Sequence, residues 1–587
     1  MMQGQRAVTM ALGLSSFLSI RAGTVVVLVV AAAVNWLSWA GVSVLYQPDS
    51  GGYVFAGLSL ARRSAEAFFQ GISLNRVPGY QGLVGLCFVL FGAVGLKALI
   101  LIQHVMMVGI ALAIKKTGDI LDSSGGLGLV AGLLTALSLQ LTGYTNMVMS
   151  EVPNAFLVSA GLYFTVRHVV HGDGRSFLWG ILILSLATMV RPAGKLLAYL
   201  LIAVPLIRVV LPHWRFFVPD VARGRAGNLR LAALGLLINA AATLPWSYYN
   251  WRTYDHFGLT GTLGLNLYSN TIEFAGIIDE SSPAIAQVRD VWDRYQRQRA
   301  ERGLPPADAD GWRVHMSILG AFQQVTGQNT AQVDVVLMRA AVDAIKLHPG
   351  AYVAHAFRNM YKDVAWYDPA YLYQPGIVED ESKPERFGHS MSLDRISEVR
   401  RNIETMVRQM GYDDIWVGFD PPSRWSELYG HLTGIYTRVI VNGHRMTIML
   451  ALGVLAATAS MARTRSAGWL VVFALVGYTV VVAGFVVPAS PRHRLAADPT
   501  LTLLHAAAVI AAIRMFIAAA IATVTERGLL QAVGRLPWFG PIDETRRRRL
   551  KALGWTLLVA YIIAATAYMG GKTWLLALVL ALVVFLL

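Results

Sequence analysis

The chain has 587 residues, of which 55% are hydrophobic and only 14% are charged, and its mean hydropathy is +0.50. No water-soluble protein of this length can bury that much apolar surface, so the composition excludes a soluble enzyme and predicts an all-α polytopic membrane protein. The formal net charge of +15 does not indicate a nucleic-acid partner, because the basic residues cluster in short loops beside apolar runs, as orientation signals do. The single cysteine, Cys87, excludes an intrachain disulfide and a cysteine-based metal site.

The first long apolar run, at 22–45, follows Arg6 and Arg21. It is longer than the core of a signal peptide and no small-residue cleavage site stands out, so we expect an uncleaved first membrane span. Further apolar runs, in chain order, cover 80–94, 97–114, 124–142, 152–168, 177–190, 194–211, 230–246, 446–462, 467–487, 499–520, 552–568 and 572–587.

The run at 80–94 differs from the others because it is only 15 residues long and begins after Pro78-Gly79. A hydrocarbon core of about 30 Å needs about 20 helical residues, so we expect this segment to be re-entrant or interfacial. Without this crossing, every basic loop falls on the cytoplasmic side, as the positive-inside rule requires. The sequence then predicts a bundle of about 12 to 13 transmembrane helices with both ends of the chain inside.

This topology divides the chain into successive domains. They are an N-terminal transmembrane module at 1–247 with a first outer loop at 46–79, an extracytoplasmic and mostly helical domain at 248–436, transmembrane helices at 437–520, a basic amphipathic cytoplasmic segment at 521–551, and terminal transmembrane helices at 552–587. The second domain is the only soluble-like stretch, and its helical patterning lies at 283–302, 330–347 and 391–410.

Two acidic residues stand beside the ends of apolar runs on the predicted outer side. Asp49 follows the first run and is flanked by glycines, so it is either a base that takes a proton from an acceptor hydroxyl or a helix N-cap. Glu151 begins the fifth run, where it either stabilises the helix dipole or acts as a second carboxylate that orients an acceptor or holds a divalent cation. The metal ligands stay unknown, and Mg²⁺ or Mn²⁺ is the cofactor left open.

Basic side chains collect on the same predicted face, where the positive-inside rule disfavours them. The set consists of Arg76, Arg191, Lys195, Arg492 and Arg494, with His493 between the last two. Guanidinium groups match phosphate oxygens well, whereas the alternative for an arginine at this depth is snorkelling to lipid headgroups. The pattern predicts an anionic, lipid-linked substrate at the outer membrane surface.

Aromatic residues crowd the end of the eighth run, from Trp246 through Tyr248 and Tyr249 to Trp251 and Tyr254. Such rings stack on sugars, and they also form the interfacial belts of membrane proteins. Both interpretations stay open from the sequence.

Taken in chain order, several short segments resemble the GT-C superfamily of integral-membrane glycosyltransferases. The most similar branch is the bacterial group related to the dolichyl-phosphate-mannose protein mannosyltransferases and the aminoarabinose and Rgt-type lipopolysaccharide sugar transferases. The matching segments are Asp49-Ser50-x-x-Tyr53, Arg76-Val77-Pro78-Gly79-Tyr80, Ser150-Glu151, Arg191-Pro192, Pro245-Trp246 with Asn250, Gly264-x-Asn266, and Arg492-His493-Arg494. They cover mainly 20–270 and 440–520.

The resemblance implies a GT-C-like bundle in the bacterial cytoplasmic (inner) membrane, with its active site facing outside. It also implies a polyprenyl-phosphate sugar donor and an inverting transfer to a glycan, lipid or protein acceptor, with Asp49 as general base and Glu151 as the second catalytic carboxylate. The residues implied to bind the donor phosphate are Arg76, Arg191, Lys195, Arg492 and Arg494. The residues expected to contact sugar or acceptor are Tyr53, Tyr80, Trp246, Asn250, Asn266 and His493.

The sequence departs from the family pattern at three places. Ser50 and Gly51 follow Asp49 where a paired acid is common, His493 stands where a tyrosine is usual, and Ala496 replaces a proline. These departures bear on metal use and on the roles of the arginines. Two other functions remain as alternatives, a ligase that uses a polyprenyl diphosphate donor and a transporter or flippase of lipid-linked glycans.

Overall fold

The computed structural model describes residues 20–42, 44–47, 49–62, 64–72, 74–211, 224–272, 282–307, 313–365, 393–411, 424–439, 443–464, 467–486 and 495–524. Within these ranges every regular element is a helix, and extended backbone pairs only in the bridge between Leu45 and Met147. The prediction of an all-α polytopic membrane protein is confirmed.

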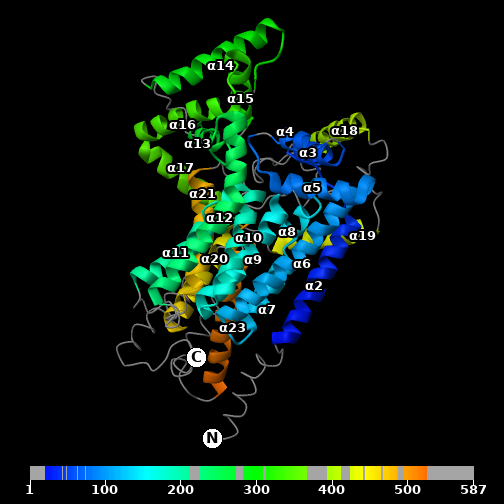
Figure 1. Cartoon of the computed structure of the whole chain (residues 1–587). Coiled ribbons are helices and arrows are strands. Elements are labelled where there is room, and N and C mark those ends of the chain that lie inside the picture. Colours follow the sequence, from blue (N-terminus) through cyan, green and yellow to red (C-terminus); the bar gives the residue numbers. More distant parts are fainter. Residues whose placement is uncertain are drawn as a thin grey trace, which may run out of the picture.

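A bundle of antiparallel helices forms the body of the molecule (Figure 1). Its members are α2 (Ile20–Gly41), α6 (Gly95–Leu121), α7 (Gly126–Ala136), α8 (Leu139–Tyr144), α9 (Glu151–His171), α10 (Gly174–Val190), α11 (Leu197–Val210), α12 (Gly224–Tyr254), α20 (Gly443–Thr464), α21 (Gly468–Phe485) and α23 (Asp498–Val524). One apolar core unites all of them except α2, and its fully buried members include Met107, Val166 and Phe177. The buried residues Val27 and Ala31 of α2 pack in a smaller core with Ala111 and Ala136.

Five segments of the described chain are long and apolar enough to cross a membrane. They are Ile20–Gly41, Pro78–Leu121, Pro192–Val210, Gly224–Tyr254 and Thr447–Thr464, while Gly126–Ala136, Gly174–Val190 and Gly468–Val482 are apolar but shorter. The expected number of about 12 to 13 transmembrane helices also rests on the run at 552–587, which lies outside the described residues.

The short apolar run expected to be re-entrant forms a helix of its own, α5 (Pro78–Phe91). Gly92 ends it with φ +54, a left-handed value that favours glycine, and the turn η1 (Gly92–Val94) leads into α6. Figure 1 shows α5 lying across the end of the bundle rather than along α6. Its 14 residues fall short of the about 20 needed for a span, and its interfacial or re-entrant placement stays a prediction.

Two short helices and one distant helix cover this end of the bundle beside α5. They are α3 (Ser50–Arg62), α4 (Ala65–Gly71) and α18 (Leu393–Gln409). The buried side chains of Ile403 and Val407 place α18 against the apolar side of α3. A methyl group on Gly57 would stand 2.6 Å from Val84 Cγ1, so α3 and α5 are in close contact.

The extracytoplasmic domain predicted at 248–436 appears as a helical insertion at the same end of the bundle (Figure 1). It comprises α13 (Leu263–Ile272), α14 (Pro283–Glu301), α15 (Arg313–Thr326), α16 (Thr330–Leu347) and α17 (Pro349–Ala365). A separate apolar core around Val291, Phe322 and Leu337 holds its first four helices together. The helical patterns at 283–302, 330–347 and 391–410 are confirmed as α14, α16 and α18. In contrast, α19 (Arg424–Val439) leaves the insertion and packs against α2.

Three basic residues that were expected in connections instead lie on helices α6, α11 and α23, at the opposite end of the bundle. Lys115 is buried and its Nζ donates to Asp119 Oδ2 at 2.6 Å, while Arg514 donates to Asp122 Oδ2 at 2.8 Å. Arg208 donates to the backbone oxygen of Val169 there. The insertion end and this basic end are therefore the two candidate membrane faces.

Candidate active site

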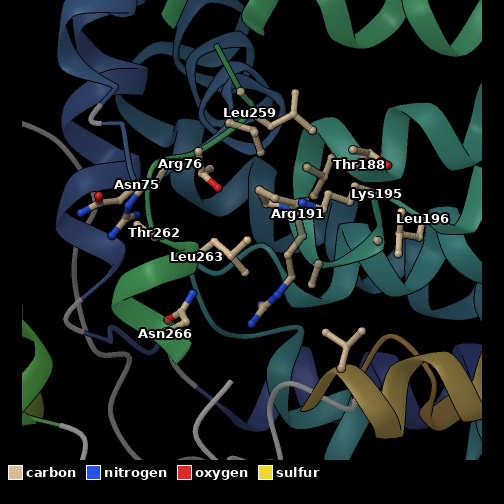
Figure 2. Close-up of a pocket in the computed structure, with 18 of the residues that line it drawn as sticks. Asn75, Arg76, Thr188, Arg191, Lys195, Leu196, Leu259, Thr262, Leu263 and Asn266 are labelled. Carbon is tan, nitrogen blue, oxygen red and sulfur yellow. The ribbon is translucent and has the colours of Figure 1, made fainter. Parts of the chain in front are cut away.

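A cavity of about 1440 Å³ lies where the insertion end of the bundle meets α13 and α16. Residues from segments almost 450 positions apart in the sequence line it, from Asp49 to Ala496. Seven of the residues predicted from sequence are among them, namely Asp49, Tyr53, Arg76, Glu151, Arg191, Lys195 and Asn266. Figure 2 shows Asn75 and Arg76 on one side of this space and Arg191 and Lys195 on the other.

Main-chain hydrogen bonds bring the first loop of the chain beside the loop that precedes α9. The backbone N–H of Leu45 donates to the oxygen of Asn146 at 2.8 Å, and that of Val148 donates to the oxygen of Leu45 at 3.2 Å. Ser50 Oγ adds a bond to the oxygen of Val148 at 3.0 Å. This pairing is the reason why Asp49 and Glu151 line the same cavity.

Asp49 directly precedes α3 and is held by Arg76, which precedes α5. Arg76 Nη2 donates to Asp49 Oδ1 at 3.0 Å, and its Nη1 donates to the backbone oxygen of Asp49 at 2.8 Å. The side chain of Asp49 is still 40% exposed. Arg76 therefore fixes the orientation of the carboxylate and leaves it accessible from the cavity.

Tyr53 links this pair to the start of α9. The guanidinium of Arg76 lies over the Tyr53 ring at 4.1 Å from its centroid, a cation–π contact. The hydroxyl of Tyr53 lies 3.5 Å from Ser150 Oγ. Burial raises the pKa of Tyr53, so its phenol is a neutral hydrogen-bonding group at pH 7.

Glu151 and Arg191 form an ion pair at the neighbouring wall. Glu151 begins α9, Arg191 directly follows α10, and Arg191 Nη1 lies 2.6 Å from Glu151 Oε1. The Glu151 side chain is only 2% exposed, whereas that of Arg191 is 19% exposed. The buried carboxylate thus holds an arginine at the cavity surface, and Figure 2 shows the Arg191 side chain extending into that space.

Lys195 lies at the edge of the cavity, next to exposed apolar side chains of the bundle. It follows the turn η2 (Pro192–Gly194), and its side chain is exposed. Leu196 and Tyr199, at the start of α11, also line the cavity and are exposed. An ammonium group therefore stands beside an apolar surface that faces away from the protein core.

The insertion supplies the far wall. Asn266 comes from α13, and Asp334 and Arg339 come from α16. Asp334 Oδ1 accepts the backbone N–H of Leu265 at 2.9 Å, so α16 fixes the start of α13 over the cavity. His256 lines the same wall and its Nε2 lies 3.0 Å from the backbone oxygen of Thr260.

Three residues expected to contact sugar or acceptor do not line the cavity. Tyr80 is fully buried, and its hydroxyl donates to Gln103 Oε1 at 3.0 Å. The indole N–H of Trp246 donates to the backbone oxygen of Leu259 at 3.0 Å, and Asn250 Nδ2 donates to that of Gly258 at 2.7 Å. Trp246 and Asn250 therefore position the backbone at 258–259, which lines the cavity, whereas Tyr80 packs in the core below α3.

The last predicted motif, Arg492-His493-Arg494, lies outside the described residues. The described chain resumes at Leu495, and Ala496 lines the cavity. The roles predicted for the two arginines and the histidine stay predictions.

The carboxylates of this cavity do not form a divalent-cation site. In the described residues no three His, Cys, Asp or Glu side chains group as metal ligands. Asp49 and Glu151 are each paired with an arginine, and Asp334 accepts backbone N–H groups. Mg²⁺ and Mn²⁺ prefer several converging oxygen ligands, so the described residues do not fit the cation that the sequence left open.

The pairing of Glu151 with Arg191 has a signal in the sequence. α9 and α10 are joined by Gly172, with φ +69, and Asp173, and they run antiparallel. In such a hairpin the first residue of one helix lies beside the last residue of the next. By contrast, the contributions of Asp334 and Arg339 depend on how α16 packs on α13, which no local pattern specifies.

No protein-family model matches this chain, and no curated protein matches its sequence. One similar solved structure is the archaeal oligosaccharyltransferase AglB from Archaeoglobus fulgidus in complex with an inhibitory peptide and a dolichol-phosphate, with 11% identity and a TM-score of 0.43 over 94% of this chain and 55% of that one. A second is an Archaeoglobus fulgidus oligosaccharyltransferase in complex with Zn and sulfate, with 11% identity and a TM-score of 0.42 over 88% of this chain and 54% of that one.

The chain therefore spans about half the length of these two structures. Scores and identities this low establish neither a shared family nor a shared activity. The resemblance to the bacterial branch of the GT-C superfamily stays a prediction, and the function is argued from the geometry of the cavity.

Proposed function

We propose that this chain is an integral-membrane glycosyltransferase that transfers a single sugar from a polyprenyl-phosphate-linked donor to an extracytoplasmic acceptor, which is a lipid, a polysaccharide or a protein. The observation that carries the proposal is the convergence of Asp49, Arg76, Glu151, Arg191 and Lys195 on one cavity at the insertion end of the bundle. The proposed setting is the bacterial cytoplasmic membrane, with this end facing outside.

The donor binds with its phosphate at Arg191 and Lys195. A guanidinium held by a buried carboxylate needs little rearrangement to meet a phosphate, and Lys195 adds a second positive charge. The polyprenyl chain remains in lipid along the exposed apolar residues Leu196, Tyr199 and Leu200. This arrangement suits a substrate whose tail cannot leave the bilayer.

Asp49 acts as the general base. The acceptor oxygen forms a bond to the anomeric carbon as the bond between that carbon and the phosphate oxygen breaks, and the acceptor proton passes to the Asp49 carboxylate. The products are the glycosylated acceptor and polyprenyl phosphate, whose charge is stabilised by Arg191 and Lys195. Glu151 is a positioning residue for Arg191 in this mechanism, because its ion pair with Arg191 engages the carboxylate.

A transfer assay on the purified full chain in lipid tests the proposal. The assay offers a panel of polyprenyl-phosphate sugars to the wild type and to Asp49→Asn, with and without EDTA. We expect one donor to be consumed, a loss of at least about 100-fold in the variant, and no dependence on EDTA. The control is Glu66→Gln, because Glu66 is an exposed acid in the same first loop that does not line the cavity.

Two results would contradict the proposal. Wild-type turnover by Asp49→Asn excludes Asp49 as the base. If no monophosphate donor is consumed, while a diphosphate-linked glycan is transferred whole or is moved across the membrane, the chain is a ligase or a transporter instead.

A further inference from the structure

The cavity continues from Arg191 into the bundle, between α9, α10 and α12. On α9 its lining includes Glu151, Asn154 and Val158, and on α12 it includes Asn239 and Ser247. With a rise of about 1.5 Å per residue, Glu151 and Val158 are about 10 Å apart along the helix axis. The recess is therefore about two helical turns deep.

Neutral polar side chains line this recess. We call the group formed by Asn154, Thr188, Asn239 and Thr243 the polar floor. Asn154, Thr188 and Asn239 are 2%, 1% and 3% exposed. Thr243 is half-buried. Polar groups buried among membrane helices are costly, so the three buried ones, each on a different helix, require partners.

The protein satisfies only part of this hydrogen-bonding capacity. Ser185 Oγ donates to Asn239 Oδ1 at 2.9 Å, and the hydroxyls of Thr188 and Thr243 donate to backbone oxygens one turn back. Asn154 Oδ1 is buried and accepts no hydrogen bond from the described residues. Each amide side chain also has two N–H donors, and each threonine oxygen can still accept.

This mixture of donors and acceptors selects for one class of ligand. A phosphate would need positive charge, and the cationic residues that line the described cavity, Arg76, Arg191, Lys195 and Arg339, are not part of the polar floor. A hydrocarbon chain would leave the amides without partners. Sugar hydroxyls both donate and accept hydrogen bonds, and the adjacent Val158 and Leu244 offer apolar surface to the C–H groups of a sugar ring.

We propose that the polar floor binds the hydroxyl groups of the donor's sugar ring and determines which sugar is accepted. This inference rests on the proposed function, because it takes the donor phosphate to bind at Arg191 and Lys195. Asn154 and Asn239 are the specificity-determining residues, since their amides can bind hydroxyls from opposite sides of the recess. A hydroxyl that is missing or inverted leaves a buried amide unsatisfied, which penalises the wrong sugar.

The test measures binding to the full chain in lipid nanodiscs by calorimetry. The probes are a short-chain polyprenyl phosphate without sugar and the same lipid phosphate carrying a hexose, a 2-acetamido-hexose or a pentose. We expect the wild type to bind one sugar-bearing lipid more tightly than the sugar-free lipid. Asn154→Ala and Asn239→Ala should each weaken that donor about tenfold and leave the affinity for the sugar-free lipid within about twofold.

Asn228→Ala is the matched control, because Asn228 is also a buried asparagine of α12 but does not line the cavity. If an alanine variant does not fold, Asn154→Ser and Asn239→Ser keep a polar group and should shift the ranking of the three sugars. An unchanged ranking, or equal losses for sugar-bearing and sugar-free lipid, overturns the inference and indicates a recess filled by water only. If the wild type binds the sugar-free lipid but prefers no sugar, the floor assignment fails alone. If it binds none of the probes, the proposed function fails as well.

Discussion

At the residue scale, the ion pair between Glu151 and Arg191 affects both the stability of the protein and the binding of the donor. Glu151 is almost fully buried, so its charge is tolerated only while Arg191 neutralises it. Removing Arg191 alone should cost about 3 kcal/mol of stability, because an unpaired carboxylate is left inside the protein. Donor binding should fall in the same variant, since the phosphate loses its guanidinium.

A double-mutant cycle separates these two effects. We expect Arg191→Met to lower the thermal unfolding temperature strongly, and Arg191→Met combined with Glu151→Leu to restore most of it, because neither charge then remains buried. Donor affinity should stay low in both. Thermal unfolding in detergent and donor binding are the two measurements, and recovery of donor binding in the double variant would exclude Arg191 from the phosphate site.

At the element scale, the contact between α5 and the end of α10 sets the position of the site. Gly79, in the first turn of α5, lies against the backbone carbonyl of Met189, and a methyl group there would collide with it. Gly79→Ala should therefore move α5 away from α10 and cost about 1 to 3 kcal/mol. Arg76 precedes α5 and Arg191 follows α10, so this movement would also separate the two arginines. Transfer activity should therefore fall more than the expression level does.

Gly82→Ala is a control on the same helix. Its added methyl group would lie 3.9 Å from the ring of Phe68, an ordinary contact, so we expect activity and unfolding temperature at or slightly above the wild-type values. Equal behaviour of the two variants in the transfer assay would show that the spacing of α5 and α10 does not position the site.

At the scale of the whole molecule, α13 and α16 of the insertion close one side of the cavity, and Asp334 maintains that arrangement. Burial raises the pKa of Asp334, so the native state binds a proton more readily than the unfolded state. The ionised form therefore costs stability at neutral pH, and this cost disappears as the pH falls to about 4. Asp334→Ala, in contrast, leaves the N–H of Leu265 unsatisfied and should cost about 1 to 3 kcal/mol.

Asp334→Asn should remove the pH-dependent cost and keep an oxygen that accepts from Leu265. We expect its unfolding temperature to exceed that of the wild type at pH 7 and to approach it at about pH 4. Thermal unfolding across this pH range measures the difference. A difference that grows toward acidic pH would contradict the direction assigned to the pKa of Asp334.

The sequence allowed the polytopic all-α class, the short α5 and seven of the cavity residues to be predicted, because hydropathy, helix length and charges at helix ends are local properties. Ligand contact at Tyr80 and Trp246 was implied by the family resemblance, yet neither side chain lines the cavity, because only helix packing decides whether a ring faces a cavity or the core. The polar floor was missed for a related reason. Asn154 and Asn239 are single asparagines within apolar runs, and only the packing of α9, α10 and α12 brings them together.

The backbone pairing of Leu45 with Met147 has a consequence for how this chain tolerates change. Since main-chain atoms make the link, apolar substitutions that fit these two buried positions keep it. The number of residues between the bridge and each carboxylate, however, is the same in the two segments. Asp49 follows Leu45 by four residues, and Glu151 follows Met147 by four residues. Inserting or deleting one residue in either interval would displace one carboxylate relative to the other in the cavity. Lineages of this protein should therefore keep the loop length here constant, while Leu45 and Met147 vary only among apolar side chains.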